Sequence, residues 1–166
     1  MTPMRWLAML GAALALVGCA TAPPFDAETV DTAVTPRGAL ERLPEAEGQR
    51  VLWGGTIIET RNLQDATQIE ILAYPLNERQ RPDTNANPLG RFLAVQPGYL
   101  ERVEYAAGRH ISVLGPLKEK AEGRIGEAEY VYPVVSIEQL ELWPVPGPPR
   151  DTQPRFHFGV GVGIHR

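Results

Sequence analysis

Short segments in which apolar and polar residues alternate recur along the middle of this chain. In residues 66–76 the alternate positions on one face are Thr67, Ile69, Ile71 and Ala73. Successive side chains of a strand point to opposite faces, so this pattern predicts a strand with one buried face. Other β-rich segments are Gln49–Thr60, Gly90–Gln96, Arg109–Leu117, Ala128–Val135 and Ser136–Trp143. Short strands at this spacing, with turn residues between them, predict an all-β sandwich or small barrel.

Three other segments lack the strand pattern. Gly38–Glu47 allows one short helical turn before the first strand. Pro97–Ala107 fits either a short helix or an irregular connection, because Tyr99 and Val103 would share one helical face. Lys118–Ile125 is rich in charged residues and predicts the tip of a hairpin.

The first expected strand contains the sequence Trp53-Gly54-Gly55. Glycine inside a strand usually marks a bulge or a close approach of another backbone. We therefore expect Trp53 to pack into the barrel and the glycines to form a bulge or to allow such an approach. A phosphate-binding loop is not indicated, because the glycine spacing differs and no helix is expected to follow.

The N-terminus has a separate pattern. A positive charge at Arg5 precedes an apolar run, Trp6–Val17, that ends in Leu16-Val17-Gly18-Cys19. The run has 12 residues, and a membrane-spanning helix needs roughly 20. It fits a signal peptide followed by a lipoprotein cleavage site. We expect cleavage after residue 18 and lipidation of Cys19, whose acyl chains would anchor the protein in a membrane.

The composition of the chain limits how the domain can be stabilised and indicates where it begins and ends. The chain has 166 residues, a formal net charge of −4, one cysteine, 16 glycines and 16 prolines. With its one cysteine at the lipidation site, the domain needs a hydrophobic core rather than an internal disulfide. The cleavage site predicts a signal peptide at 1–18, and the following stretch rich in Ala, Thr, Pro and Asp predicts a flexible lipidated tether at 19–37. The strand-forming segments place a β-barrel domain at 38–143, and a Pro/Gly-rich tail follows at 144–166.

Several short motifs occur in a set order along the chain: Val51-Leu52-Trp53-Gly54-Gly55, Gly90-Arg91-Phe92, Tyr130-Val131-Tyr132-Pro133-Val134 and Leu142-Trp143. Together they resemble the Slp family of outer-membrane lipoproteins. The resemblance spans roughly Phe25 to Trp143, together with the lipidation signal. It implies an envelope lipoprotein linked to starvation and stress, with no established enzymatic activity. The order of the expected strands resembles an OB-like barrel of five or six strands.

The candidate binding or structural residues come from these motifs: Trp53, Gly54, Gly55, Arg91, Phe92, Tyr130 and Trp143. Most of the aromatic residues are expected to pack in the core or at strand edges. An exposed subset beside arginines would favour a glycan, a peptide or a protein partner. Nucleic acid is not expected as a partner, because the chain is acidic and has no basic cluster.

Catalytic chemistry has little support in the sequence. The three histidines are scattered, so no metal site and no cofactor are expected. Ser112 and Ser136 lack the context of a nucleophile. Strand carboxylates such as Glu70 and Glu129 could in principle pair for glycoside cleavage, but such residues usually form a solvated sheet face. We therefore expect a non-enzymatic structural or adaptor protein of the outer membrane, with its domain facing the periplasm. The alternative is a module that binds a periplasmic oligosaccharide or peptide, and a cell-wall hydrolase is a third hypothesis.

Overall fold

The computed structural model describes residues 22–27, 30–31, 33–43 and 45–145 of the chain. The predicted signal peptide, the lipidation site at Cys19 and all of the tail beyond residue 145 lie outside the described residues. These predictions therefore stay predictions. No helix among the described residues has the length and apolar character needed to cross a bilayer.

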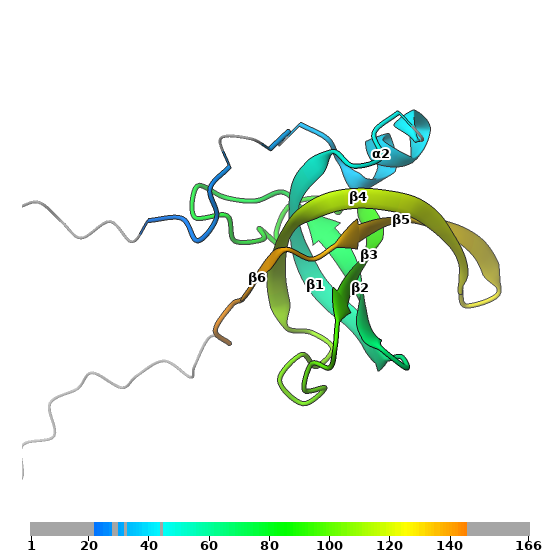
Figure 1. The fold of residues 1–166 in the computed structure, drawn as a ribbon. Coiled ribbons are helices and arrows are strands. Elements are labelled where there is room, and N and C mark those ends of the chain that lie inside the picture. Colours follow the sequence, from blue (N-terminus) through cyan, green and yellow to red (C-terminus); the bar gives the residue numbers. More distant parts are fainter. Residues whose placement is uncertain (1–21, 28–29, 32, 44, 146–166) are drawn as a thin grey trace, which may run out of the picture.

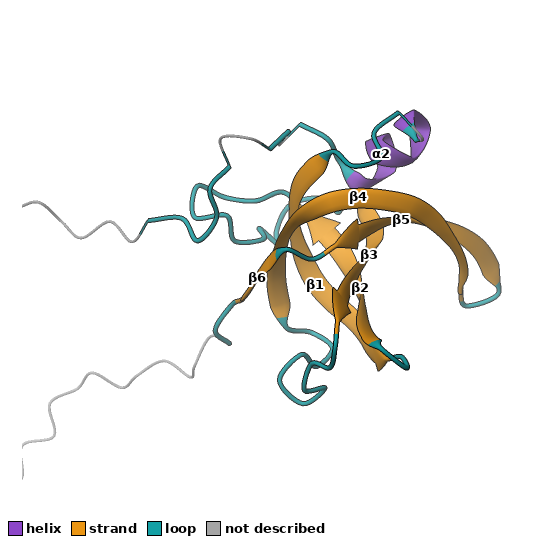
Figure 2. Ribbon diagram, viewed as in Figure 1, coloured by secondary structure: helices purple, strands orange, loops and turns teal. Residues whose placement is uncertain are grey.

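The described chain is mostly β-structure (Figure 2). The short helix α2 and six strands follow one another in sequence: α2 (Pro36–Arg42), β1 (Arg50–Asn62), β2 (Ala66–Tyr74), β3 (Gly90–Pro97), β4 (His110–Ile125), β5 (Ala128–Ser136) and β6 (Gln139–Leu142). Thr35 caps the helix by accepting a hydrogen bond from the backbone N–H of Gly38, and Pro36 occupies its first turn.

Five of the strands form a closed ring. The sheet order is β1-β2-β3-β5-β4-β6, and β1 also pairs with β4 to close the circle. All neighbouring pairs are antiparallel except β3 and β5, which run parallel. This closed order is that of a five-stranded OB-like barrel, so the predicted all-β fold class is confirmed. Strand β6 continues along β4 outside the ring (Figure 1).

The barrel interior is filled by apolar side chains. The largest fully buried ones include Phe92, Ile57, Ile69, Ile71, Ile111 and Leu117. The burial of β2 alternates residue by residue along the strand, as its sequence predicts. The core is thus a packed interior and not a channel.

Strand β4 corrects one prediction. Lys118–Ile125 is not a hairpin tip but the second half of β4, and it pairs with β5 as far as Ile125–Ala128. The sequence of this half predicts a loop because it is rich in charged residues, and most of its side chains are indeed exposed. Tertiary pairing with β5 extends the strand beyond the apolar stretch, so the two strands form a long arm that projects from the barrel (Figure 1).

The structure decides between the two expectations for Gly54 and Gly55. Gly54 and Gly55 pair in unbroken register with β2 and β4, and the bulge in β1 lies between Ile57 and Glu59. The alternative expectation, a close backbone approach, is the one observed. A Cβ atom on Gly55 would overlap the backbone carbonyl of Leu72, and one on Gly54 would lie 2.6 Å from the Ser112 Oγ.

The segment before the helix also differs from a free tether. Phe25 and Val34 are buried, at 5% and 2% exposure. Within the expected tether at 19–37, these described residues therefore pack on the barrel. Pro97–Ala107 follows the irregular alternative, because its residues form turns rather than a helix.

Candidate functional site

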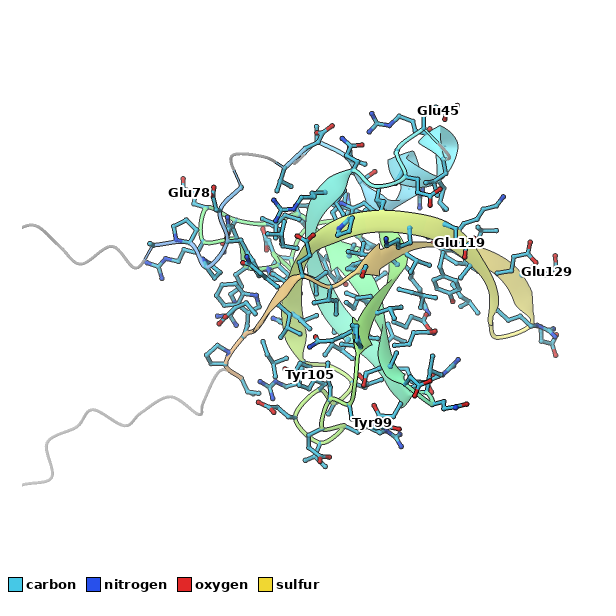
Figure 3. All side chains as sticks on the ribbon, viewed as in Figure 1. Glu45, Glu78, Tyr99, Tyr105, Glu119 and Glu129 are labelled. Carbon is cyan, nitrogen blue, oxygen red and sulfur yellow. The ribbon has the colours of Figure 1, made fainter. Side chains whose placement is uncertain are left out.

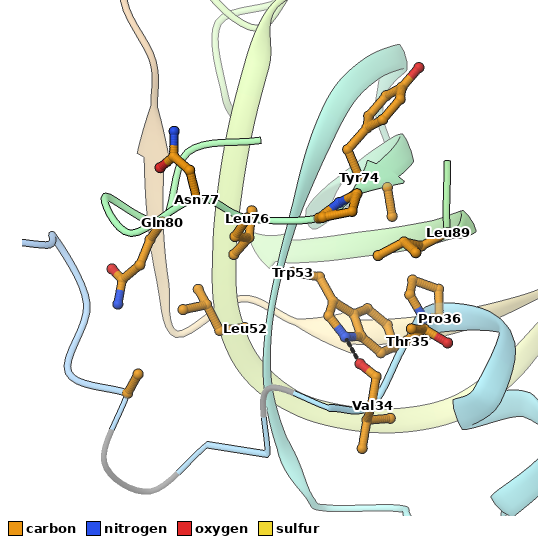
Figure 4. Close-up of a pocket in the computed structure, with 13 residues that line it drawn as sticks. Val34, Thr35, Pro36, Leu52, Trp53, Tyr74, Leu76, Asn77, Gln80 and Leu89 are labelled. Atoms are coloured by element: carbon orange, nitrogen blue, oxygen red, sulfur yellow. Dashed lines mark hydrogen bonds between the residues drawn. The ribbon is translucent and has the colours of Figure 1, made fainter. Parts of the chain in front are cut away.

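A pocket of about 500 Å³ lies between the N-terminal segment and one end of the barrel (Figure 4). Its walls come from the N-terminal segment, from β1, from the end of β2 and from the loop that follows β2. The lining residues include Val34, Leu52, Trp53, Leu76, Gln80 and Leu89. A volume of this size falls within the range of small-molecule sites, and its walls are mainly apolar.

Trp53 forms one wall of this pocket and is 5% exposed. Its ring meets that of Phe92 edge to face, with centroids 5.2 Å apart. Its indole Nε1–H donates a hydrogen bond of 2.6 Å to the carbonyl oxygen of Val34 (Figure 4). Trp53 therefore joins the barrel core to the N-terminal segment.

A second contact fixes the same segment farther towards the N-terminus. The Phe25 side chain packs with Leu52 and Leu114. The side-chain amide of Gln80 accepts a hydrogen bond from the Phe25 N–H and donates one to the Phe25 carbonyl, each at 2.9 Å. We call this pair of hydrogen bonds the Phe25–Gln80 clamp.

The loop that carries Gln80 is in turn tied to β4 and to the end of β6. Ser112 Oγ donates to the Gln80 carbonyl at 2.7 Å and accepts from Trp143 Nε1 at 2.9 Å. The Arg81 guanidinium lies 5.9 Å from the centre of the Trp143 ring, a cation–π distance. Burial, and then the nearby charge of Arg81, hold the pKa of His110 below its ordinary value.

A polar cluster occupies the outer face of β2, β3 and β5. Arg91 and Glu70 form an ion pair at 2.6 Å, and both side chains are partly buried. The Tyr132 hydroxyl donates to the same Glu70 oxygen at 3.3 Å, while the Tyr130 hydroxyl accepts from the Arg91 backbone N–H at 3.1 Å. Burial, followed by the Glu70 charge, raises the pKa of Tyr132. The carboxylate therefore accepts hydrogen bonds from two groups of the protein itself.

The family model described as "Outer membrane lipoprotein Slp family" matches residues 16–160. The chain belongs to this family. Its members are outer-membrane lipoproteins by description, so association with the outer membrane follows from membership. The resemblance found in the sequence motifs is thereby confirmed.

Two relatives from Escherichia coli K12 illustrate the family. The "Uncharacterized lipoprotein YeaY" is 32% identical over 157 residues, which cover 90% of this chain and 79% of the relative. The "Outer membrane protein Slp" is 30% identical over 115 residues, covering 69% of this chain and 61% of that protein. Among solved structures, a small single-stranded DNA-binding protein from Streptomyces coelicolor aligns with a TM-score of 0.36 and 12% identity. It covers 57% of this chain and 94% of that one, a likeness too slight to bear on function.

The structure divides the candidate residues of this family member into three places. Trp53, Gly54, Gly55 and Phe92 lie in or against the core. Arg91 and Tyr130 meet in the outer polar cluster. Trp143 lies apart from both groups, against Ser112 and Arg81.

The sequence did not reveal the residues that tie the N-terminal segment and Trp143 to the loop after β2. Phe25, Gln80 and Ser112 were not among the candidates. The sequence does contain one indication that Phe25 is buried, because it is a lone aromatic residue in a segment rich in Ala, Thr and Pro. It contains no such indication for Gln80, since the role of Gln80 depends on the path of a loop that the sequence does not specify.

Within the described ranges, no group of three or more His, Cys, Asp or Glu side chains lies close enough to hold a metal ion.

Two tyrosines of the segment between β3 and β4 differ in exposure. Tyr99 is 69% exposed, whereas Tyr105 is buried at 9% (Figure 3).

Proposed function

We propose that this outer-membrane lipoprotein is a non-catalytic adaptor of the cell envelope, held by lipid on Cys19 with its barrel in the periplasm. We further propose that it serves the envelope under starvation or stress. Its candidate partners are envelope proteins or glycans. The absence of nucleic acid among its partners stays a prediction from its acidic charge.

The observation that carries the proposal is that apolar side chains fill the interior of the barrel. Trp53 and Phe92, the most prominent aromatic candidates, contact each other inside the core and are 5% and 0% exposed. The Glu70 carboxylate bonds to Arg91 and Tyr132, which favours a positioned structural group over a free general acid or base. Interaction through the outer surface, as in an adaptor, fits this arrangement better than chemistry inside the barrel.

The pocket beside Trp53 favours one alternative, a module that binds a peptide or an oligosaccharide. Its apolar walls carry the side chains of Asn77 and Gln80 at one side (Figure 4). A few polar groups on apolar walls are typical of ligand sites. For this alternative, a ligand would contact Trp53 directly.

Crosslinking in intact cells tests the two proposals. A photoreactive residue at exposed Tyr99 or Glu129 should capture envelope proteins if the surface is an adaptor, whereas one at Leu76 should capture a ligand of the pocket. Protein levels compared between growing and starved cells test the stress link. Failure to capture any envelope component from the exposed positions would contradict the adaptor proposal.

Lipid attachment is tested separately. Cys19→Ser should abolish fatty-acid labelling and leave an unprocessed precursor or a soluble protein. Normal labelling of this variant would contradict the predicted anchor. Protease digestion of whole and of permeabilised cells tests the periplasmic location, since only permeabilised cells should lose the barrel.

A further inference from the structure

The N-terminal segment is fastened to the barrel at two points. Phe25 is held by the Phe25–Gln80 clamp and by apolar packing on Leu52 and Leu114. Nine residues later, the carbonyl of Val34 accepts the hydrogen bond from Trp53. Because Phe25 itself is held on the barrel, the chain leaves the barrel towards its N-terminus from a fixed position at Phe25.

That position lies close in sequence to the predicted anchor. Phe25 is the sixth residue after Cys19. Six residues in the most extended conformation span at most roughly 22 Å. A lipid on Cys19 would therefore keep the side of the barrel that carries Phe25 within about this distance of the membrane surface.

The clamp also defines which surface lies on that side. Gln80 belongs to the loop between β2 and β3, so this loop lies beside the N-terminal segment (Figure 1). Glu78, in the same loop, and Glu129, on the arm formed by β4 and β5, lie at opposite sides of the molecule (Figure 3). From Leu117 to Ile125 the arm contains eight residue steps, or up to about 26 Å of extended strand.

We propose that the Phe25–Gln80 clamp orients the barrel on the membrane. The loop between β2 and β3 faces the phospholipid headgroups, and the β4–β5 arm faces away from them into the periplasm. The charges of this loop are balanced, with Arg79 and Arg81 beside Glu78 and Asp83, so anionic headgroups exert no net repulsion on it. The proposal rests on the lipid anchor proposed above. It assigns the arm as the part of the molecule that an envelope partner meets first.

Energy transfer on vesicles tests this orientation. The full lipidated protein carries a donor dye on Glu78→Cys or on Glu129→Cys and is reconstituted in vesicles of phosphatidylethanolamine and phosphatidylglycerol with an acceptor dye on the headgroups. Both sites are exposed glutamates, so the two variants are matched in charge. We expect clearly higher transfer from position 78 than from position 129.

Releasing the clamp should remove this difference. Phe25→Ser takes away the apolar packing, and Gln80→Ala takes away both hydrogen bonds, so the two variants test the clamp by separate routes. Pro23→Ser, at an exposed neighbouring position, is the control and should preserve the difference. Circular dichroism of each variant verifies that the barrel remains folded.

Flotation of the vesicles separates the two proposals. If the wild-type protein fails to float with the vesicles, the anchor proposal is wrong and the orientation falls with it. If it floats but transfers energy equally from both positions, the anchor stands and the orientation is wrong. A difference that survives unchanged in both folded release variants would overturn the role of the clamp.

Discussion

Trp53 offers the sharpest test of how the barrel and the N-terminal segment support each other. The proposed change is Trp53→Ala, compared with Trp53→Phe. The alanine variant removes the whole ring, including its edge-to-face contact with Phe92 and its hydrogen bond to Val34. The phenylalanine variant keeps an aromatic ring in the core but cannot donate the hydrogen bond.

The expected magnitudes follow from burial and bonding. Trp53 is 5% exposed, and a tryptophan buries roughly 200 Å², worth about 5 kcal/mol at ~25 cal/mol per Å². Measured losses for removing a buried tryptophan are about 3–5 kcal/mol. Trp53→Phe should cost about 1–2 kcal/mol, since one hydrogen bond contributes about 1 kcal/mol and the Val34 carbonyl loses its partner.

Urea denaturation followed by circular dichroism measures both effects. The protein for this experiment begins at residue 20 and therefore carries no lipid. A chain that begins at Gly38 would lack the buried Phe25 and Val34. With a slope of about 2 kcal/mol per M, Trp53→Ala should lower the midpoint by about 2 M. Trp53→Phe should lower it by about 0.5–1 M.

Two results would refute the reasoning. A midpoint for Trp53→Ala within about 0.3 M of wild type would show that the ring is not part of the core. If that variant also lost its crosslinks in cells, Trp53 would instead carry an interaction surface. Equal losses for the alanine and phenylalanine variants would mean that the hydrogen bond to Val34, rather than ring packing, dominates.

The other predictions concern single positions. Gly55→Ala should destabilise the fold by about 3 kcal/mol or more, because its Cβ would meet the backbone of a paired strand; an unchanged urea midpoint would contradict this. Ser112→Ala should cost about 1–3 kcal/mol by leaving the Trp143 indole and the Gln80 carbonyl without their shared partner; its thermal midpoint provides the measurement. The pKa of His110 is lower in the folded protein than in the unfolded chain, so folding favours the neutral imidazole. The stability that this preference contributes is present above the pKa of the unfolded state and is lost as the pH falls through the pKa of the folded state. His110→Gln should therefore flatten the loss of stability between about pH 7 and pH 5, and identical pH profiles for the variant and wild type would exclude this role.

The sequence by itself determined the fold class and most of the strands. Alternation in residues 66–76 places Ile69 and Ile71 on the buried face of β2, because side chains of a strand alternate irrespective of what they pack against. The family motifs identified the outer-membrane lipoprotein family. Both kinds of information are local, carried by neighbouring residues or by short motifs.

Only the tertiary structure decided the features that depend on distant partners. The second half of β4 is charged, and pairing with β5 makes it a strand. The Leu72 backbone leaves no room for a Cβ at Gly55, and the bulge of β1 lies between Ile57 and Glu59. Phe25 is buried because Gln80, 55 residues away, satisfies its backbone groups and lets the segment dock. Local patterns cannot encode these outcomes, since each depends on a hydrogen-bonding or packing partner that folding brings from far along the chain.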